Sequence, residues 1–579
     1  MAQTDNFFLD RPVQSRATRL AWILLILATL YFCYFHNLGA IGFVGPDEPR
    51  YAWIARDMAE TGDWITPRLY GKPWFEKPVL YYWSAALSFK LFGVSEAAAR
   101  LPSALSALLA TLPMAWLALR LYGAETARWL LLLLPTTIGM IGFSHAAATD
   151  MPFAATLTIA MVCAAVVLGL ARNANTPILP RTPWLALLLL GLFLGLAALA
   201  KGPAAIILSG GPVLLWAIFT KRWRDAFRCV HPVAIASFCL TALPWYILCA
   251  RRNPDFFRIF IIEHNFKRYL TPEFQHIQPF WFYIPIVLIA LAPWTLLLLW
   301  SAISGLLRSW QNRQISAFAI FLLSWAGFCL VFFSTSQSKL PGYVLPAVPA
   351  IGLLLTRSYV AFSGSVLRAF RWLIVGSSLL TFPASLVLLW TGRHFSTSRT
   401  NAKVIFVVGC VLLLFTVTNL LLGIRPATRR SAFYPAALCV LPIFLILVLF
   451  HIFSSPWLRY DPSGKTLAAE IHALQIPPDQ IYVARMPRGQ QFSLNFYLRH
   501  QVENWSVDSP KEGYLLLTSK ACSHYVKPPW ACASEPIQLQ SSGWFLYSVR
   551  QAQSMSRLGR LGALGGDYNL GDLAGRQPR

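Results

Sequence analysis

The sequence predicts a polytopic α-helical membrane protein with about thirteen spanning helices, and three observations carry this prediction. Of its 579 residues, 56% are hydrophobic and only 13% are charged, whereas about 25% of the residues in soluble domains are charged. Apolar runs of about 20 residues, enough to cross about 30 Å of hydrocarbon, recur along most of the chain. Basic residues gather in every second connection between these runs, as alternating cytoplasmic loops require.

The spans follow from the apolar runs in chain order. The first run lacks a small-residue cleavage site after it, so we expect an uncleaved anchor rather than a signal peptide. The expected spans are 18–36, 97–119, 127–143, 151–170, 183–199, 203–220, 231–250, 280–301, 316–333, 342–360, 370–391, 403–424 and 432–452.

The basic residues set the expected orientation. An odd number of spans places the N-terminus in the cytoplasm and the segment after residue 455 outside. The formal net charge of +25 is therefore mostly topogenic. It does not indicate nucleic-acid binding, because the charge is spread over short loops. The clusters are Arg11/Arg16/Arg19, Arg120/Arg128, Arg172/Arg181, Lys221/Arg222/Arg224, Arg308/Arg313, Arg357/Arg368/Arg371 and Arg425/Arg429/Arg430.

Residues 1–455 are expected to form the membrane domain, with membrane lipids as its solvent. It contains a long first external loop at 37–96 and an external cap loop at 251–279. Within the first loop, 51–59 and 78–92 combine helical apolar spacing with aromatic residues. That composition is typical of helices that lie in the membrane interface.

Residues 456–550 predict a small α/β domain on the periplasmic side. Alternating apolar residues indicate strands near 480–485 and 513–518, and 463–474 has the spacing of a helix. The tail at 551–579 is rich in Gly, Arg and Ser and is expected to be disordered.

Two of the ten cysteines, Cys522 and Cys532, fall in this C-terminal domain. An external location permits a disulfide between them. Two free thiols are an equal alternative, because the sequence does not give the distance between their Cα atoms.

The first candidate for an active site is residues 45–51, where the chain leaves the first span. Asp47 and Glu48 stand together there in a chain with few acidic residues. Carboxylates beside a bilayer are costly unless they are functional. The alternative for Asp47 is a helix N-cap before Pro49. Asp150, at the expected junction of the third and fourth spans, lies on the same external side and carries the same two interpretations.

External cations indicate an anionic ligand on that side. Lys77 stands among aromatic residues and prolines at the expected interface, where an ammonium suits a lipid phosphate. Its alternative is simple snorkelling to the interface. Lys201, Lys339 and Tyr343 come from other external connections. Together they suit an anionic lipid donor, an anionic acceptor, or both.

Glu76, His264 and His276 are candidate ligands for a zinc ion. Their spacing is not diagnostic, and a hydrogen-bonded loop near phosphates is the alternative. A metal bound there would be structural and would connect two external loops; the chemistry requires no cofactor.

Taken in order, these motifs resemble the GT-C glycosyltransferases that use polyprenyl-phosphate sugars. Within that superfamily they are most similar to the bacterial transferases that attach 4-amino-4-deoxy-L-arabinose to lipid A. Gly342 makes its motif slightly atypical, and from residue 365 onward the resemblance is one of topology. The matching pieces are 46–51, 62–65, 75–78 with Tyr82 and Trp83, 201–202, 263–264, 279–281 and 339–343.

The resemblance implies thirteen membrane helices, interfacial helices in the first external loop and a periplasmic C-terminal domain. It also implies an inverting transferase of the inner membrane, with undecaprenyl-phosphate-linked aminoarabinose as donor and a lipid A phosphate as acceptor. Such a reaction modifies lipopolysaccharide and favours resistance to cationic peptides such as polymyxin.

Residue by residue, the resemblance makes Asp47 the principal catalytic carboxylate, with Asp150 and Glu48 in support. The implied donor-phosphate ligands are Lys77, Arg268 and Tyr343. The implied cavity and acceptor residues are Arg50, Tyr51, Lys201 and Lys339.

Two other functions remain open at this point. One is a GT-C enzyme that moves another sugar to protein or to another envelope glycan. The other is a transporter of lipid-linked sugars, which could also hold phosphates with external cations. The one-sided placement of the candidate residues and the lack of an internal repeat count against transport.

Overall fold

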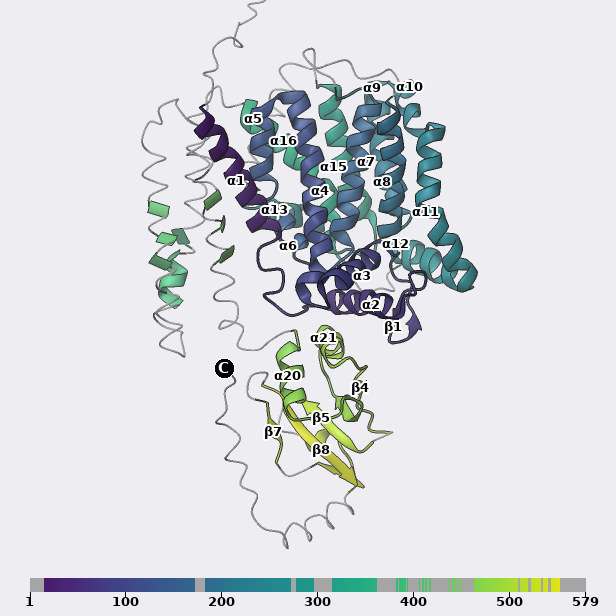
Figure 1. Cartoon of the computed structure of the whole chain (residues 1–579), viewed down its shortest axis with the longest axis vertical. Helices are drawn as coiled ribbons and strands as arrows, with labels where there is room; N and C mark the ends of the chain where they lie inside the picture. The colour runs from purple at the N-terminus through teal and green to yellow at the C-terminus, as the bar shows by residue number, and fades with distance from the viewer. Residues whose placement is uncertain are drawn as a thin grey trace, which may run out of the picture. The chain divides into compact units, whose positions relative to one another are not determined.

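A computed structural model gives the fold, and its contacts divide the chain into two compact units (Figure 1). The first unit holds residues 1–40 and 51–456, and the second holds residues 41–50 and 457–579. The structure describes residues 15–171, 183–271, 277–295, 315–361, 463–508, 511–518, 522–532, 535–539 and 543–551, with scattered positions between 382 and 448.

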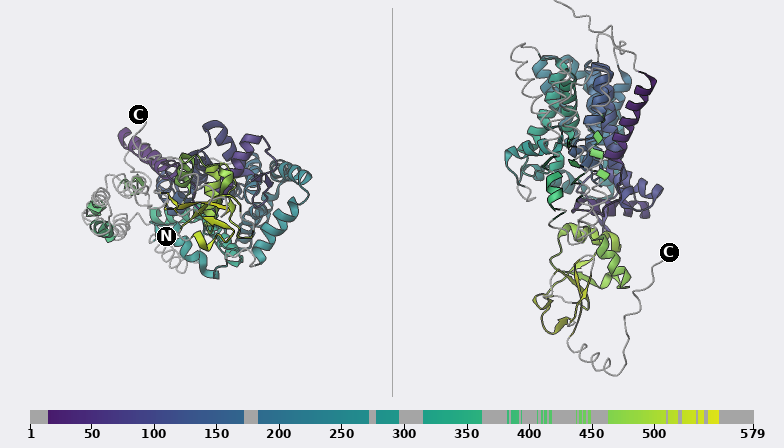
Figure 2. Two further views of the ribbon diagram at one scale, coloured as in Figure 1. Left: turned by 90° about the horizontal axis from the view of Figure 1, so that it is seen from below. Right: turned by 90° about the vertical axis from the view of Figure 1, so that its left-hand side faces the viewer.

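The first unit is a helical bundle in which α4, α7 and α8 pack side by side (Figures 1 and 2). Seven of the described helices are long and apolar enough to cross a membrane, which agrees with a multi-pass membrane protein. The bundle helices are α1 (Arg16–Tyr34), α4 (Glu96–Tyr122), α5 (Ala124–Leu133), α6 (Ile138–Ser144), α7 (Asp150–Val167), α8 (Trp184–Lys201), α9 (Ala204–Thr220), α10 (Trp223–Phe227), α11 (Pro232–Arg252), α13 (Tyr283–Ala290), α15 (Ala317–Thr335) and α16 (Val348–Ala361).

The spans predicted between residues 18 and 250 and at 316–333 and 342–360 agree with these helices, with one correction. A single span was expected at 127–143, but the chain there bends by 62° between α5 and α6. Pro135 lies at the break and cannot donate a backbone hydrogen bond. Thr137 then accepts a hydrogen bond from the backbone N–H of Met140 and starts α6. Of the span expected at 280–301, α13 ends at Ala290 and residues 296–301 lie outside the described residues. The expected spans at 370–391, 403–424 and 432–452 lie almost wholly outside the described residues.

Short helices, turns and strands lie at the end of the bundle where α7 begins. The helix expected at 51–59 is part of a longer α2, and the one expected at 78–92 begins two residues later. These elements are α2 (Asp47–Thr61), β1 (Arg68–Leu69), β2 (Lys72–Pro73), α3 (Leu80–Phe92), the π-helix η2 (Arg258–Lys267), α12 (Arg268–Leu270), and the 3-10 turns η4 (Phe280–Phe282) and η5 (Pro341–Ala347).

Small residues let α8 and α11 approach closely. A Cβ added at Gly195 would lie 2.7 Å from the Cβ of Thr241, and one at Gly191 would strike the carbonyl oxygen of Ala234. Glycine at such a contact allows two helix backbones to pack in a membrane. This packing fixes the end of α8, where Lys201 stands.

The second unit is a small α/β domain, as the sequence predicts. Its strands lie in the order β4-β3-β5-β8-β6, with β7 also paired to β8. β3 is parallel to both of its neighbours, while β8 is antiparallel to β5, β6 and β7. The elements are α20 (Lys465–Ala473), the 3-10 turn η7 (Pro478–Gln480), β3 (Ile481–Val483), α21 (Arg488–Leu498), β4 (Glu503–Asn504), β5 (Gly513–Leu517), the 3-10 turn η8 (Cys522–His524), β6 (Trp530–Cys532), β7 (Ile537–Gln538) and β8 (Phe545–Gln551).

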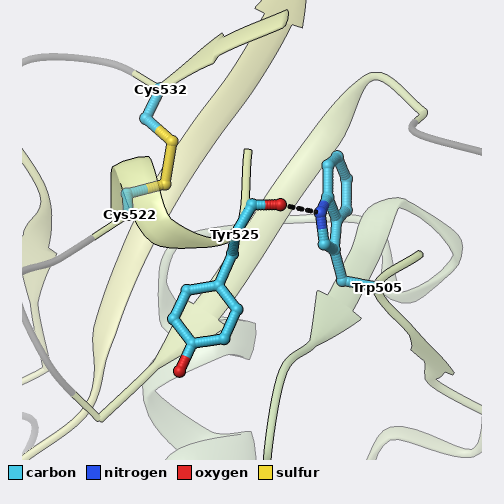
Figure 3. Close-up of a disulfide and its surroundings, with 4 residues drawn as sticks. All are labelled: Trp505, Cys522, Tyr525 and Cys532. Carbon is cyan, nitrogen blue, oxygen red and sulfur yellow. Dashed lines mark hydrogen bonds between the residues drawn. A yellow bond between two sulfur atoms is a disulfide. The ribbon is translucent and has the colours of Figure 1, made fainter. Parts of the chain in front are cut away.

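The structure answers whether the two cysteines of the C-terminal domain are paired. Cys522 and Cys532 form a disulfide with their Cα atoms 6.4 Å apart (Figure 3). Nearby, the indole N–H of Trp505 donates to the carbonyl oxygen of Tyr525 at 2.7 Å. The disulfide and this hydrogen bond hold the segment between β5 and β6.

Residues 41–50 also belong to the second unit, although the sequence placed them in the first external loop of the membrane domain. The Phe43 ring contacts the Phe496 ring with centroids 4.8 Å apart. The hydroxyl of Tyr497 accepts a hydrogen bond from the backbone N–H of Phe43, and the hydroxyl of Ser493 donates to its carbonyl oxygen. A segment distant in sequence is thereby incorporated into the domain.

Candidate active site

A cavity of about 360 Å³ opens in the first unit between α9, η2, α12, α15 and the segment that leads into η5. Its lining combines cationic side chains with aromatic rings. The lining residues are Lys77, Lys201, Pro203, Ala204, Ile207, His264, Asn265, Phe266, Arg268, Tyr269, Leu270, Phe332, Phe333, Ser336, Ser338 and Tyr343. Four sequence candidates for phosphate or cavity contacts therefore meet here: Lys77, Lys201, Arg268 and Tyr343.

Asp150 is held next to this cavity by Lys201. Asp150 is the first residue of α7 and Lys201 the last of α8, so the antiparallel packing of these helices brings the two side chains together. The Lys201 ammonium donates to the Asp150 carboxylate at 2.6 Å. The same ammonium lies 4.7 Å from the centre of the Tyr343 ring. The ion pair and this cation–π contact fix both charges at one point of the site.

Arg268 forms the second ion pair. Its guanidinium lies 3.4 Å from the Glu76 carboxylate, and both side chains are mostly buried. Burial lowers the pKa of Arg268, but the electrostatic interactions with Tyr343, with the Glu76 carboxylate and with Tyr51 outweigh it and keep that pKa above its ordinary value. Arg268 is therefore cationic at neutral pH.

Lys77 follows Glu76 directly and lines the cavity. Burial is the main cause that lowers the pKa of Lys77 to about 8, and the nearby charge of Arg268 adds to it. No carboxylate lies within ion-pair distance of its ammonium among the described residues. An anion in the cavity would stabilise the protonated form of Lys77.

Tyr51 and Tyr343 complete the aromatic surroundings of these charges. The Tyr51 ring contacts those of Tyr81 and Tyr82, with centroids 6.1 and 5.7 Å apart. Tyr343 reaches the cavity because Gly342 precedes it: a Cβ at that position would lie only 2.9 Å from an Asp150 oxygen. The residue that looked atypical in the sequence allows η5 to approach Asp150.

Asp47, Glu48 and Arg50 lie in the second unit, not in the helical bundle. Asp47 begins α2 and pairs with Arg50, whose Nε also donates to the carbonyl oxygen of Pro46. Glu48 is buried and accepts a hydrogen bond from the backbone N–H of Val44 at 2.9 Å. Glu48 therefore holds the turn that precedes α2, while Asp47 remains about half exposed.

Lys339 makes a different contact from the one that the sequence suggests. It is buried, and its ammonium donates to the carbonyl oxygen of Ser336 at 2.6 Å. This hydrogen bond shapes the loop before η5 and holds Ser336 and Ser338 at the cavity. The sequence interpretation missed both serines, although they stand in the same short motif as Lys339.

The candidate zinc ligands are only partly described. Glu76 is engaged by Arg268, and His264 lines the cavity with its pKa lowered by burial, so His264 is neutral at pH 7. His276 lies outside the described residues. Within the described part of the chain, no three His, Cys, Asp or Glu side chains gather into a metal site. The described residues do not by themselves fit a zinc ion.

Comparisons with known proteins relate the chain to a family and to solved structures. The family model of dolichyl-phosphate-mannose-protein mannosyltransferases matches residues 20–260. The undecaprenyl phosphate-alpha-4-amino-4-deoxy-L-arabinose arabinosyl transferase of Edwardsiella ictaluri is 35% identical over 328 residues, which cover 56% of this chain and 57% of that protein. The protein of the same name from Serratia proteamaculans is 30% identical over 438 residues, or 74% of this chain and 76% of that protein.

A solved structure shares the fold. The crystal structure of ArnT from Cupriavidus metallidurans bound to undecaprenyl phosphate matches with a TM-score of 0.72 and 23% identity, and covers 91% of this chain and 98% of that one. The bundle with its C-terminal domain is therefore the GT-C fold of ArnT. The sequence match to the first relatives spans little more than half of their length.

Proposed function

The chain belongs to the family of undecaprenyl phosphate-alpha-4-amino-4-deoxy-L-arabinose arabinosyl transferases, and on that premise we propose that it transfers this sugar to lipid A. The donor is the sugar linked to undecaprenyl phosphate, and the acceptor is a lipid A phosphate at the periplasmic face of the inner membrane. The product is a modified lipopolysaccharide with less negative charge, which favours resistance to cationic antimicrobial peptides.

The observation that carries the proposal is the charge of the cavity. Lys77, Lys201 and Arg268 converge on it, against the two carboxylates of Asp150 and Glu76. The surplus of positive charge suits a lipid phosphate, and the aromatic and aliphatic lining suits the first units of a prenyl chain.

The same residues suit the chemistry. The bond between the sugar and the donor phosphate breaks through an oxocarbenium-like state, and the departing undecaprenyl phosphate gains negative charge. Lys77 and Arg268 stabilise that charge without reorganisation, because both are fixed by burial or by an ion pair. A single displacement by the acceptor phosphate inverts the anomeric centre. A phosphate acceptor is already anionic and needs no strong general base.

Asp47 and Asp150 are the proposed catalytic carboxylates. With an anionic acceptor, a carboxylate orients groups, stabilises positive charge at the sugar or pairs with its 4-amino group. With a hydroxyl acceptor, Asp47 would have to accept a proton instead. We derive no step through a metal ion; zinc stays a sequence prediction of a structural site at Glu76, His264 and His276.

The proposal includes an orientation. Alternating basic loops place the N-terminus in the cytoplasm and the C-terminal domain in the periplasm. The disulfide between Cys522 and Cys532 supports an oxidising location for that domain.

Mass spectrometry of lipid A tests the proposal. The host makes the aminoarabinose donor, lacks its own transferase and carries either the wild-type chain or Asp47→Asn. We expect one added aminopentose per modified phosphate with the wild type only. Purified Asp47→Asn should still bind undecaprenyl phosphate, because in a transferase this change removes turnover and leaves binding of the lipid phosphate intact. A transporter carries no such expectation. Unmodified lipid A, with the wild-type chain present in the membrane, would contradict the assignment and favour another sugar or acceptor.

A further inference from the structure

We propose that the first unit holds a second ligand site, which binds one acyl chain of an anionic phospholipid beside α10. The site lies along the middle of α8, the later part of α7 and the length of α9, and it shares no lining residue with the cavity at Lys77 and Lys201. It is therefore separate from the candidate active site, and the inference does not depend on the proposed transferase activity.

The site is an apolar cavity of about 360 Å³ between five helices. α7 contributes Met161, α8 contributes Leu190, α9 contributes Val213, α10 contributes Phe227 and α11 contributes Ile235. Among the described residues that line it, Ser209 alone has a hydroxyl, which donates to the carbonyl oxygen of Ile206 within α9 and so has its partner. A lining of this kind suits a hydrocarbon chain and offers no group that would hold a sugar.

A glycine keeps the cavity open. A Cβ added at Gly210 would meet no heavy atom within 4 Å, although this residue lines the cavity from the middle of α9. At the neighbouring Gly211, a Cβ would instead strike the ring of Phe328. The two adjacent glycines therefore serve different purposes: Gly211 permits packing against α15, and Gly210 leaves room in the cavity.

Charge in and beside α10, which lines the cavity with Trp223 and Phe227, favours an anionic headgroup. Four basic residues stand in and beside α10, against the single carboxylate of Asp225. Asp225 pairs with Arg222 at 2.6 Å and with Arg228 at 3.1 Å. The side chains of Lys221 and Arg224 are exposed and have no ion pair within the described part of the chain. They are available to a phosphate beside the cavity.

The short helix α10 joins the two features. Trp223 and Phe227 are one helical turn apart, and both line the cavity. Helices with aromatic residues on one face and basic residues on the other lie in the membrane interface. A lipid with its acyl chain between α9 and α11 would thus have its headgroup next to Lys221 and Arg224. Basic residues at this depth prefer anionic over zwitterionic lipids.

Native mass spectrometry of the purified full chain measures this binding. Phosphatidylglycerol and phosphatidylcholine are added at equal ratios, and the fraction of protein that carries one lipid is compared. We expect phosphatidylglycerol to be retained about fivefold better for each basic residue at the headgroup. Lys221→Gln combined with Arg224→Gln should abolish that preference and leave residual binding of both lipids.

Gly210→Leu tests the chain pocket, and Gly327→Leu is its matched control. Gly327 is an exposed helical glycine of α15, and a Cβ there also meets nothing within 4 Å. Gly210→Leu should lose most of the bound phosphatidylglycerol, and Gly327→Leu should keep it, with the melting temperatures of both near that of the wild type.

Three results would overturn the inference. The first is equal retention of the two lipids by the wild type, and the second is unchanged retention by Gly210→Leu. The third is displacement of phosphatidylglycerol by undecaprenyl phosphate, one for one, which would assign the cavity to a prenyl chain.

Discussion

Neutralising Lys77 should weaken the binding of undecaprenyl phosphate and change how that binding depends on pH. The ammonium lines the cavity, and no carboxylate among the described residues is within ion-pair distance of it. A hydrogen bond between a charged donor and a phosphate contributes about 1.5–3 kcal/mol, which corresponds to a roughly 10- to 150-fold change in Kd. We expect Lys77→Gln to raise Kd by this factor at pH 7.

The pH dependence has a definite sign. Burial and the charge of Arg268 lower the pKa of Lys77 to about 8. Lys77 is therefore mostly protonated at pH 7 and mostly neutral at pH 9. A bound phosphate favours the protonated lysine, so binding is strongest below pH 8 and weakens as the pH rises through 8. For the wild type, Kd should increase about fivefold between pH 8 and pH 9. The ligand keeps its charge over this range, because the second pKa of a phosphate monoester is about 6.

The assay is calorimetric titration of the full chain in detergent micelles with undecaprenyl phosphate at pH 7, 8 and 9. Lys72→Gln is the matched control, because Lys72 is an exposed lysine on β2 in the same loop. The control should reproduce the wild-type profile, whereas Lys77→Gln should show weak binding with little dependence on pH. If Lys77→Gln binds as tightly as the wild type, or keeps the same slope, Lys77 does not contact the phosphate.

Three further changes test other parts of the structure. Lys201→Met leaves the Asp150 carboxylate mostly buried without its ion-pair partner. The free energy of unfolding should therefore fall by about 3–5 kcal/mol, which is measured as a lower Tm. Asp150→Asn in the same chain should restore part of the lost stability. Gly342→Val places a side chain against Asp150 and should reduce kcat by up to about a hundredfold through misplacement of the carboxylate; an unchanged rate of lipid A modification would contradict that geometry. Cys522→Ser combined with Cys532→Ser removes a disulfide that joins residues 10 positions apart. The C-terminal domain should lose about 2–3 kcal/mol of unfolding free energy, which is measured as lower resistance to protease. Unchanged protease resistance would mean that the bond contributes nothing to stability.

The sequence by itself determined the membrane bundle and the chemical character of its site. Hydrophobic length is a local property, so the spans at 97–119 and 183–199 could be located from their residues alone and agree with α4 and α8. The identities of Lys77 and Lys201 indicated an anionic ligand, and the resemblance to one family added Arg268. Alternation of apolar residues likewise located β3 and β5 in the C-terminal domain.

Only the tertiary structure decided which of these residues meet. The ion pair between Lys201 and Asp150 depends on the antiparallel packing of α7 and α8, and residues 51 positions apart carry no local signal of it. Residues 41–50 join the C-terminal domain because Phe43 packs there, a contact between segments more than 400 residues apart. Gly342 looked like a departure from a motif until its distance to Asp150 was known. Pairings of this kind are set by the packing of whole helices and domains, and local sequence patterns do not contain that information.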